Sequence, residues 1–264
     1  MPTTPQSLIL CSMLTLTLTL TTAAGGAEKF SHSDWTDVLA KYVDSAGRVN
    51  YAGLARDRAA LDRYVAAIEK TSPKSSPELF PTREEALAYY LNAYNAMVVK
   101  GVLARLPGVD TVWTPFGTGY SFFVGMTIKI GGQETNLKKL EDDVVRAEFQ
   151  DPRIHAALNC ASIGCPRLPQ KAFEPATLDA ELDAEMREFV GEARNCSVDT
   201  ARRQVKLSKI FDWFADDFLA HERRLGNASP NVLDYVNRYR APGQLVPRDF
   251  AVSFFDYDKG LNKQ

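Results

Sequence analysis

The sequence has 264 residues, of which 45% are apolar and 24% charged, and its formal net charge at pH 7 is −2. This composition is typical of an ordinary globular protein with enough apolar residues for a sizeable core. A nearly neutral chain, with its densest basic run at 202–206, lacks the positive surface that nucleic-acid binding requires. We therefore expect no nucleic-acid partner.

The first 27 residues have the pattern of an export signal. They contain no Asp, Glu, Lys or Arg, and an apolar run over Leu8–Leu20 precedes a group of small residues at 23–27. The run is shorter than a transmembrane helix requires, and the small residues suit signal cleavage. We predict a signal peptide over residues 1–27, a single globular domain over 28–264, a periplasmic or secreted location, and no stable membrane insertion after cleavage.

The first elements of the mature chain are predicted to be helices. Ser33 is positioned to cap a helix that extends to about Lys41, and apolar residues spaced along Leu61–Ile68 mark a second helix. The segment 71–77 combines Ser, Thr and Pro and reads as a loop. It separates two helical regions of one domain.

The clearest helix is predicted over Thr82–Leu106, before Pro107. Thr82 and Glu85 have the spacing of a capping box, and apolar residues recur at helical intervals. Asn95 falls on the apolar face, so its amide is expected to enter the core and to need hydrogen-bond partners there. Asn92 lies one turn earlier on a neighbouring stripe.

Short hairpins and further helices follow. The segment 127–133 predicts a hairpin around Gly-Gly, with a helix starting after Asn136, and a second hairpin is expected over 196–207. Ser208 and then Ser229-Pro230 are predicted to start helices, and 252–255 is strand-like. Because strands do not alternate regularly with helices, we predict an α+β fold: a mostly helical single domain with short β-hairpins and a C-terminal strand.

The stretch 151–166 is the strongest candidate for chemistry, because it contains His155 with Cys160 and Cys165. An imidazole near a thiol can accept its proton, which predicts Cys160 as a nucleophile and His155 as its base or orienter. Five residues apart, the two side chains cannot meet within a regular helix or strand. The pair therefore requires a bend near Asn159, or else His155 has a partner elsewhere, such as Asn95 or a carboxylate.

Three other roles remain open for these cysteines. Cys160 and Cys165 can form a local disulfide, leaving Cys196 free, or they can be small core residues. A metal site of His155, Cys160 and Cys165 lacks the usual ligand spacing, so we assign no metal and no cofactor. Asn92 and Asn95 are assigned as amide support for the site, against the alternative of purely structural amides. No GxGxxG, P-loop, GxSxG or HExxH motif is present.

Several motifs together resemble the domain of unknown function 547 family, found in exported bacterial proteins and in the C-terminal part of some plant proteins. The motifs that carry the resemblance are Arg48–Tyr51, Tyr90–Ala96, Asp151–Pro166, Leu207–Phe214, Asp217-Phe218, Tyr257-Asp258 and Leu261-Asn262.

The resemblance supports the fold unit and the place of the site, and it implies no activity. It implies that residues matching Asn92, Asn95, His155 and Cys160 belong to the family pattern, while plant-like members can carry Ser where Cys165 stands. This chain departs from the pattern at Lys259-Gly260, where a Trp-Ser pair is usual. If that Trp lines a pocket, the pocket of this protein differs.

Two functional hypotheses follow. The first is a thiol-dependent hydrolase or acyl transferase that uses Cys160, His155, Asn95 and Asn92. The second is a non-catalytic periplasmic domain for binding or scaffolding, in which the same His, Asn and Cys side chains form a buried polar core. In either case we expect the partner to be a small molecule or a peptide.

Overall fold

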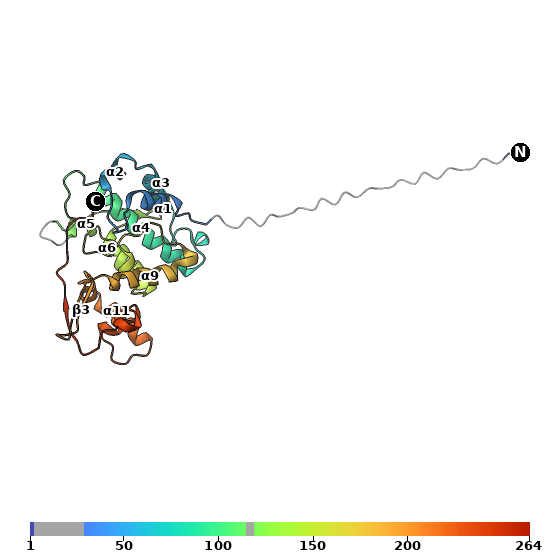
Figure 1. Ribbon diagram of the computed structural model, residues 1–264. Coiled ribbons are helices and arrows are strands. Elements are labelled where there is room, and N and C mark those ends of the chain that lie inside the picture. The colour runs from blue at the N-terminus through green and yellow to red at the C-terminus, as the bar shows by residue number, and fades with distance from the viewer. Residues whose placement is uncertain (3–28, 115–118) are drawn as a thin grey trace.

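The computed structural model describes residues 1–2, 29–114 and 119–264, and it confirms the predicted α+β class with helices in the majority. Apart from Met1 and Pro2, the predicted signal peptide over 1–27 lies outside the described residues, so cleavage stays a prediction. The thin grey traces in Figure 1 mark the remaining two segments.

The N-terminal part is helical, as predicted, but the predicted cap at Ser33 is wrong. Ser33 is the first residue of the helix and its N–H donates to Ser31 Oγ, while His32 occupies the N-cap position without a side-chain cap hydrogen bond. Helix α1 (Ser33–Tyr42) packs against α3 (Ala59–Lys70), where the rings of Trp35 and Tyr64 stack with centroids 6.0 Å apart. The short helix α2 (Tyr51–Arg56) lies between them in the chain. A 3₁₀ turn, η1 (Pro77–Leu79), follows the predicted loop.

Helix α4 (Arg83–Leu103) is the central element of the molecule. It begins at the predicted capping box, because Thr82 Oγ1 accepts from Glu85 N at 3.1 Å and Thr82 N donates to Glu85 Oε2 at 2.9 Å. It ends before the predicted Leu106, since Pro107 disfavours helical geometry in the residue that precedes it. Almost every residue after the first turn is buried.

The middle of the chain contains the first predicted hairpin. After α5 (Tyr120–Phe123), strands β1 (Ile128–Ile130) and β2 (Gln133–Thr135) pair antiparallel across Gly131 and Gly132, whose φ angles of +55° and +83° suit glycine. Asn136 caps the next helix by accepting from Lys139 N at 2.9 Å, as predicted.

That helix is irregular. It starts as α6 (Leu137–Lys139), continues as a π-helical segment η2 (Leu140–Arg146) and ends as α7 (Ala147–Phe149). Short π-helical segments are rare and are frequent at functional sites. The sequence pattern did not predict this change of geometry.

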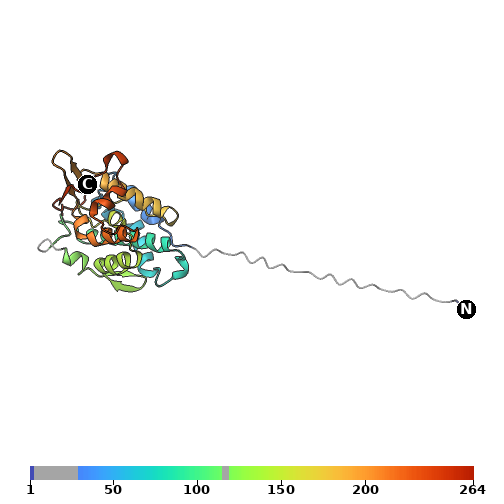
Figure 2. The same ribbon diagram turned by 90° about the horizontal axis from the view of Figure 1, so that it is seen from below.

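The C-terminal half adds helices and the second sheet. Helix α8 (Ile154–Ala157), the 3₁₀ turn η3 (Pro175–Thr177) and α9 (Leu178–Gly191) come first. Strands β3 (Cys196–Asp199) and β4 (Gln204–Leu207) form the second predicted hairpin, and β5 (Ala251–Phe254) pairs parallel with β4. In Figure 2 the green hairpin of β1 and β2 lies at one edge, apart from the brown strands of this sheet.

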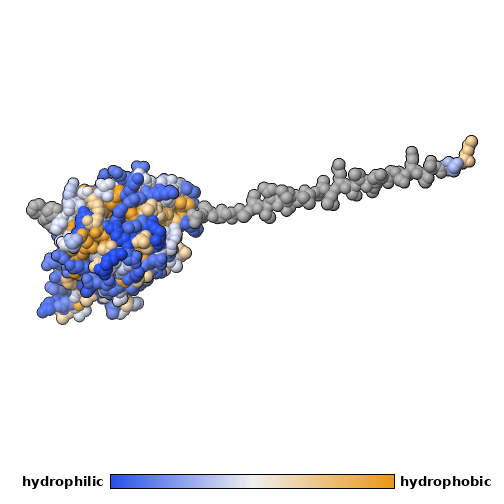
Figure 3. Space-filling view, turned by 90° about the horizontal axis from the view of Figure 1, so that it is seen from above, coloured by the Kyte–Doolittle hydropathy of each residue, from blue (hydrophilic) through white to orange (hydrophobic). Residues whose placement is uncertain are grey.

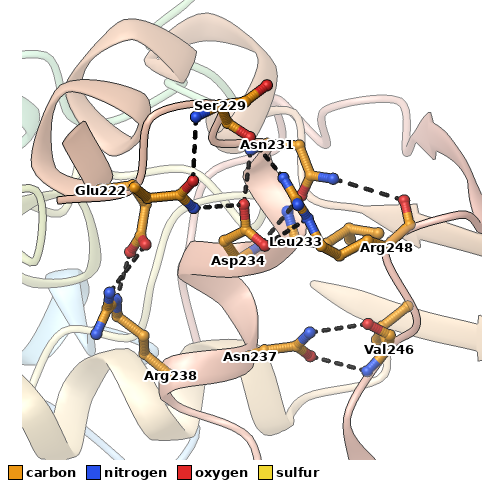
Figure 4. A network of polar contacts seen from close by, with 10 residues as sticks. Glu222, Ser229, Asn231, Leu233, Asp234, Asn237, Arg238, Val246 and Arg248 are labelled. Atoms are coloured by element: carbon orange, nitrogen blue, oxygen red, sulfur yellow. Dashed lines mark hydrogen bonds and ion pairs between the residues drawn. The ribbon is translucent and has the colours of Figure 1, made fainter. Parts of the chain in front are cut away.

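The helix predicted from Ser208 is divided in two, α10 (Ile210–Trp213) and α11 (Ala215–Arg224), with the break at Phe214. The predicted start at Ser229-Pro230 is wrong. Helix α12 (Val232–Arg238) begins after Asn231. The Asn231 side chain accepts from Leu233 N and Asp234 N, and the Asp234 carboxylate accepts from Asn231 N in return, as Figure 4 shows. These reciprocal hydrogen bonds favour a helix start at Asn231 over the predicted start at Ser229-Pro230. A 3₁₀ turn, η4 (Pro242–Gln244), follows.

Buried apolar residues form two clusters, one around α4 and a smaller one around Phe211, Phe218 and Tyr235. Helices α8 and α9 contribute to both clusters. Ala157 belongs to the first cluster and Ala156 to the second. Helix α8, which carries His155, therefore lies where the two clusters meet.

The C-terminus returns to the N-terminal helices, where Figure 1 shows its label beside α2. Val49 N donates to Asn262 O at 2.8 Å and Gln264 N donates to Val49 O at 3.1 Å. Most of the surface in Figure 3 is hydrophilic, with apolar patches between. Within the described ranges, no helix combines the length and apolar character needed to cross a membrane.

Candidate functional site

His155 is held by a carboxylate, one of the partners that the sequence left open, although the sequence did not indicate that this carboxylate is Asp217. Its Nε2 lies 2.8 Å from Asp217 Oδ2 on α11, and its ring stacks on Phe214 with centroids 4.0 Å apart. Because an ionised carboxylate only accepts, Nε2 carries the proton and Nδ1 is the basic atom of the neutral ring. Among the described residues, Nδ1 makes no hydrogen bond.

Asp217 also binds Arg146, from the π-helical segment. Arg146 Nε and Nη2 donate to its two oxygens at 2.8 and 3.2 Å, and the guanidinium lies over the Phe214 ring. Burial opposes ionisation of Asp217, but the hydrogen bonds from His155 and Arg146 hold its pKa well below the usual range. Burial lowers the pKa of His155, and the Asp217 carboxylate offsets only part of this effect. His155 is therefore a neutral base at pH 7.

Glu141 is the second titratable group of the site. It lies in the π-helical segment, and its Oε2 accepts a hydrogen bond of 3.0 Å from the Tyr94 hydroxyl on α4. Burial raises the pKa of Glu141 to about 7, against the opposing effect of this hydrogen bond. A carboxyl group with such a pKa can give or accept a proton near neutrality.

The loop after α8 contains a disulfide between Cys160 and Cys165, with the two Cα atoms 6.1 Å apart. Cys196 is free and buried. The predicted pairing is thereby confirmed. The Tyr257 hydroxyl lies 2.8 Å from Cys160 Sγ and 3.0 Å from Cys165 Sγ, and Cys160 N donates to Cys165 Sγ at 2.9 Å.

Buried amides hold this loop in place. Asn95 Nδ2 donates to Ala157 O and Asn95 Oδ1 accepts from Asn159 N, both at 2.9 Å. The Asn159 side chain in turn donates to Pro166 O at 2.8 Å and accepts from Ala161 N at 2.9 Å. Asn95 therefore positions the exit of α8 and the start of the disulfide loop.

Asn92 has a similar role at another point of the chain. Its Nδ2 donates to Phe173 O at 2.9 Å and its Oδ1 accepts from Phe173 N at 3.0 Å. Asn92 is fully buried and anchors the segment before α9 to α4.

His155, Glu141 and the disulfide share a cavity of about 370 Å³. Aromatic side chains form most of its wall: Tyr94, Trp113, Tyr120, Phe123, Trp213, Phe214 and Tyr257. Val124, Leu158, Pro166 and Ile210 add aliphatic surface. Lys138, paired with Asp142 at 2.5 Å, is the remaining charged group among the described lining residues. A mainly apolar cavity with a few convergent polar groups is the usual form of a small-molecule site.

The structure brings together two of the four predicted site residues, because His155 and Cys160 line the cavity. Asn92 and Asn95 are absent from its described lining and bind backbone groups. The catalytic roles assigned to all four residues stay predictions. In the described state Cys160 Sγ is bonded to Cys165, so a nucleophilic Cys160 requires reduction of this bond.

Three residues of the site were missed as site residues: Asp217, Glu141 and Tyr257. Asp217 has the spacing of a solvated residue on an amphipathic helix, although it and Tyr257 fall in motifs that carry the family resemblance. No local pattern distinguishes Glu141. Within the described ranges, no group of three or more His, Cys, Asp or Glu side chains is arranged to hold a metal ion.

Comparison with known families agrees with the resemblance. Residues 79–190 match the family model described as "Protein of unknown function, DUF547". The matched segment contains Glu141, His155 and both disulfide cysteines, whereas Asp217 and Tyr257 lie beyond it. No curated protein and no solved structure matches the chain.

Proposed function

We propose that this protein, which carries a DUF547 family domain over residues 79–190, binds a small and largely apolar molecule in the aromatic cavity and exchanges protons with it through Glu141 and His155. The observation that carries the proposal is the placement of two titratable side chains, Glu141 and His155, in the wall of one apolar cavity. Perturbed titratable groups that meet in a cavity are typical of functional sites.

The two groups suit opposite roles. His155, kept neutral by burial, can accept a proton at Nδ1, while its Nε2 is fixed by Asp217. Glu141, with a pKa raised to about 7, can donate a proton near neutral pH. When the environments of two titratable groups shift their pKa values in opposite directions, one group can act as the acid and the other as the base of one reaction.

Binding can be tested by filling the cavity. Val124 is partly buried and lines the cavity, so Val124→Trp occupies space that a ligand would use. Leu225→Trp places the same side chain at an exposed position that is 55% accessible and is absent from the described cavity lining, and it serves as the matched control. Ligand-observed NMR with a set of small aromatic compounds is the measurement.

We expect compounds that bind the native protein to lose their signal changes with Val124→Trp and to keep them with Leu225→Trp. Equal binding to both variants would contradict the proposal, since the compounds would then sit elsewhere. Loss of binding with Glu141→Gln alone, in a folded variant, would identify Glu141 as a ligand contact.

A thiol-dependent hydrolase or acyl transferase is a second proposal, favoured by the presence of His155 and Cys160 in the wall of the same cavity. It requires the reduced protein, in which Cys160 Sγ can attack a carbonyl group. After mild reduction, iodoacetamide near neutral pH should label Cys160, and labelling should fall in His155→Ala. If iodoacetamide labels Cys160 slowly and at the same rate in His155→Ala, the proposal of thiol catalysis is contradicted and the proposal of ligand binding remains.

We also propose that the protein acts in the periplasm or outside the cell, after loss of residues 1–27. The Cys160–Cys165 disulfide supports this location, because disulfides persist in oxidising compartments. Intact mass of protein from the periplasmic or secreted fraction tests the proposal. A mature N-terminus at Glu28 is expected, and a retained Met1 with cytoplasmic residence would contradict it.

A further inference from the structure

The two sulfurs of the disulfide differ in access. Both cysteines line the aromatic cavity, but Cys160 is partly exposed, whereas Cys165 is only 2% exposed. A thiolate that attacks a disulfide must approach one sulfur along a free path. The greater exposure of Cys160 favours attack at Cys160 Sγ, with Cys165 Sγ as the leaving atom.

The leaving sulfur lies within hydrogen-bond distance of two donors. Cys160 N donates to Cys165 Sγ at 2.9 Å, and the Tyr257 hydroxyl lies 3.0 Å from the same atom. Disulfide sulfurs carry no hydrogen, so the tyrosine hydroxyl is the donor in its contact with either sulfur. Burial raises the pKa of Tyr257, which keeps this hydroxyl protonated.

These donors are held by rigid neighbours. Tyr257 packs against Trp213 and Trp113, with ring centroids 4.7 and 5.5 Å away. Asn159 fixes the backbone next to each cysteine, since its side chain binds Ala161 N after Cys160 and Pro166 O after Cys165. Preorganised donors aimed at an atom that gains negative charge lower the barrier to its departure.

We propose that Cys160–Cys165 is a site of thiol–disulfide exchange for a thiol that is attached to an apolar or aromatic group. The incoming thiol loses its proton to solvent, and its sulfur forms a bond to Cys160 Sγ. The Cys160–Cys165 bond breaks, and its electron pair stays on Cys165 Sγ as a thiolate, which Cys160 N and the Tyr257 hydroxyl stabilise.

A second molecule of the thiol can then attack the mixed disulfide at the substrate sulfur. This step releases an oxidised substrate dimer and leaves Cys160 and Cys165 as two thiols, so two substrate thiols are oxidised and one protein disulfide is reduced. The aromatic wall selects the group attached to the thiol. The proposal does not depend on proton exchange by Glu141 and His155.

The experiment uses the full, oxidised protein and benzyl mercaptan near neutral pH, followed by iodoacetamide and peptide mass spectrometry. We expect the benzyl group on Cys160 and the iodoacetamide label on Cys165. Attachment mainly to Cys165, or exchange only after unfolding, would overturn the proposal.

The substrate class is tested on the native protein without any variant. 2-Mercaptoethanol, a polar thiol of comparable acidity, is the reference, and oxidised glutathione is the open disulfide that corrects for intrinsic reactivity. The ratio of the rates of benzyl mercaptan and 2-mercaptoethanol should be roughly tenfold higher on the protein than on oxidised glutathione, the equivalent of burying one or two methylene groups. An equal ratio would overturn the apolar selectivity.

The hydroxyl donor is tested by Tyr257→Phe, which should slow exchange by roughly tenfold, since a hydrogen bond to a charged group is lost. Tyr42→Phe is the matched control, because the Tyr42 hydroxyl binds Asp57 and makes no contact with the disulfide among the described residues. An unchanged rate in a folded Tyr257→Phe variant would refute stabilisation of the leaving sulfur by this hydroxyl.

Discussion

His155 Nε2 lies 2.8 Å from Asp217 Oδ2, although 62 positions separate the two residues in the sequence. The same carboxylate receives two hydrogen bonds from Arg146. Asp217 therefore has two roles. It orients the His155 imidazole, and it compensates the charge of the half-buried Arg146 guanidinium. Loss of this carboxylate should affect both the base and the stability of the fold.

Asp217→Asn should lower the free energy of unfolding by about 1–3 kcal/mol at neutral pH, because Arg146 loses an ionised partner. The pKa of Asp217 is depressed in the folded protein, so its stabilising effect is present above the unfolded pKa and is lost as the pH falls. The difference from the native protein should therefore shrink below about pH 4. Urea unfolding across this range measures it.

Asp216→Asn is the control for this prediction. It makes the same chemical change at the neighbouring exposed position. We expect it to alter the free energy of unfolding by less than about 0.5 kcal/mol. Equal losses from Asp216→Asn and Asp217→Asn would show that the ion pair with Arg146 contributes nothing specific.

Elements with a local signal could be predicted from the sequence. The start of α4 follows from the Thr82–Glu85 capping box, and the turn between β1 and β2 follows from Gly131-Gly132. The pairing of Cys160 with Cys165 could be predicted because the two residues are close in the chain, whereas formation of the bond was one of several open alternatives. In each case the residues that decide the structure are separated by five positions or fewer.

Features that depend on distant contacts could not be predicted. Asp217 has the spacing of a solvated residue on an amphipathic helix, and only the packing of α11 beside α8 turns it toward His155. Glu141 enters the cavity on a π-helical segment, which no periodicity indicated. Asn95 was correctly placed in the core, but its partners, Ala157 O and Asn159 N, come from the chain 62 and 64 residues further on.

Glu141→Gln should stabilise the protein at alkaline pH relative to acidic pH. Burial raises the pKa of Glu141 to about 7, so the folded state opposes ionisation and the native protein loses stability as the pH rises from the unfolded pKa through 7. Glutamine does not ionise. The variant should gain about 1–3 kcal/mol over the native protein between about pH 5 and about pH 8.

Urea unfolding of both proteins at several pH values measures this gain. Glu134→Gln changes an exposed carboxylate on β2 and should show no such pH dependence. A constant difference between Glu141→Gln and the native protein across the range would mean that Glu141 ionises as an ordinary surface carboxylate, and it would remove the acid from the proposed function.

Asn95→Ala should lower the free energy of unfolding by about 2–4 kcal/mol, because Ala157 O and Asn159 N would both lose a buried hydrogen-bond partner. Asn95→Asp retains the acceptor for Asn159 N but loses the donor to Ala157 O, and it buries a carboxyl group. Thermal melts with circular dichroism compare the two. Little change in stability for Asn95→Ala would contradict the structural role and return Asn95 to the list of catalytic candidates.

Gly164→Ala tests the packing that places Tyr257 over the disulfide. Gly164 N donates to Asp258 O at 2.9 Å, and a Cβ added at Gly164 would lie 2.9 Å from Asp258 O and 3.0 Å from Asp258 N. Both atoms belong to the backbone of the residue after Tyr257, so the clash cannot be relieved by a rotamer change. The C-terminal segment must move away from the loop, and the Tyr257 hydroxyl must move away from the two sulfurs. We expect a loss of about 1–3 kcal/mol in the free energy of unfolding, together with slower thiol exchange at Cys160.

Gly243→Ala is the matched control, since nothing lies within 4 Å of a Cβ added there. Urea unfolding and the exchange rate with benzyl mercaptan are measured on both variants; a Gly164→Ala protein as stable and as reactive as Gly243→Ala would refute the close contact between the disulfide loop and the C-terminal segment.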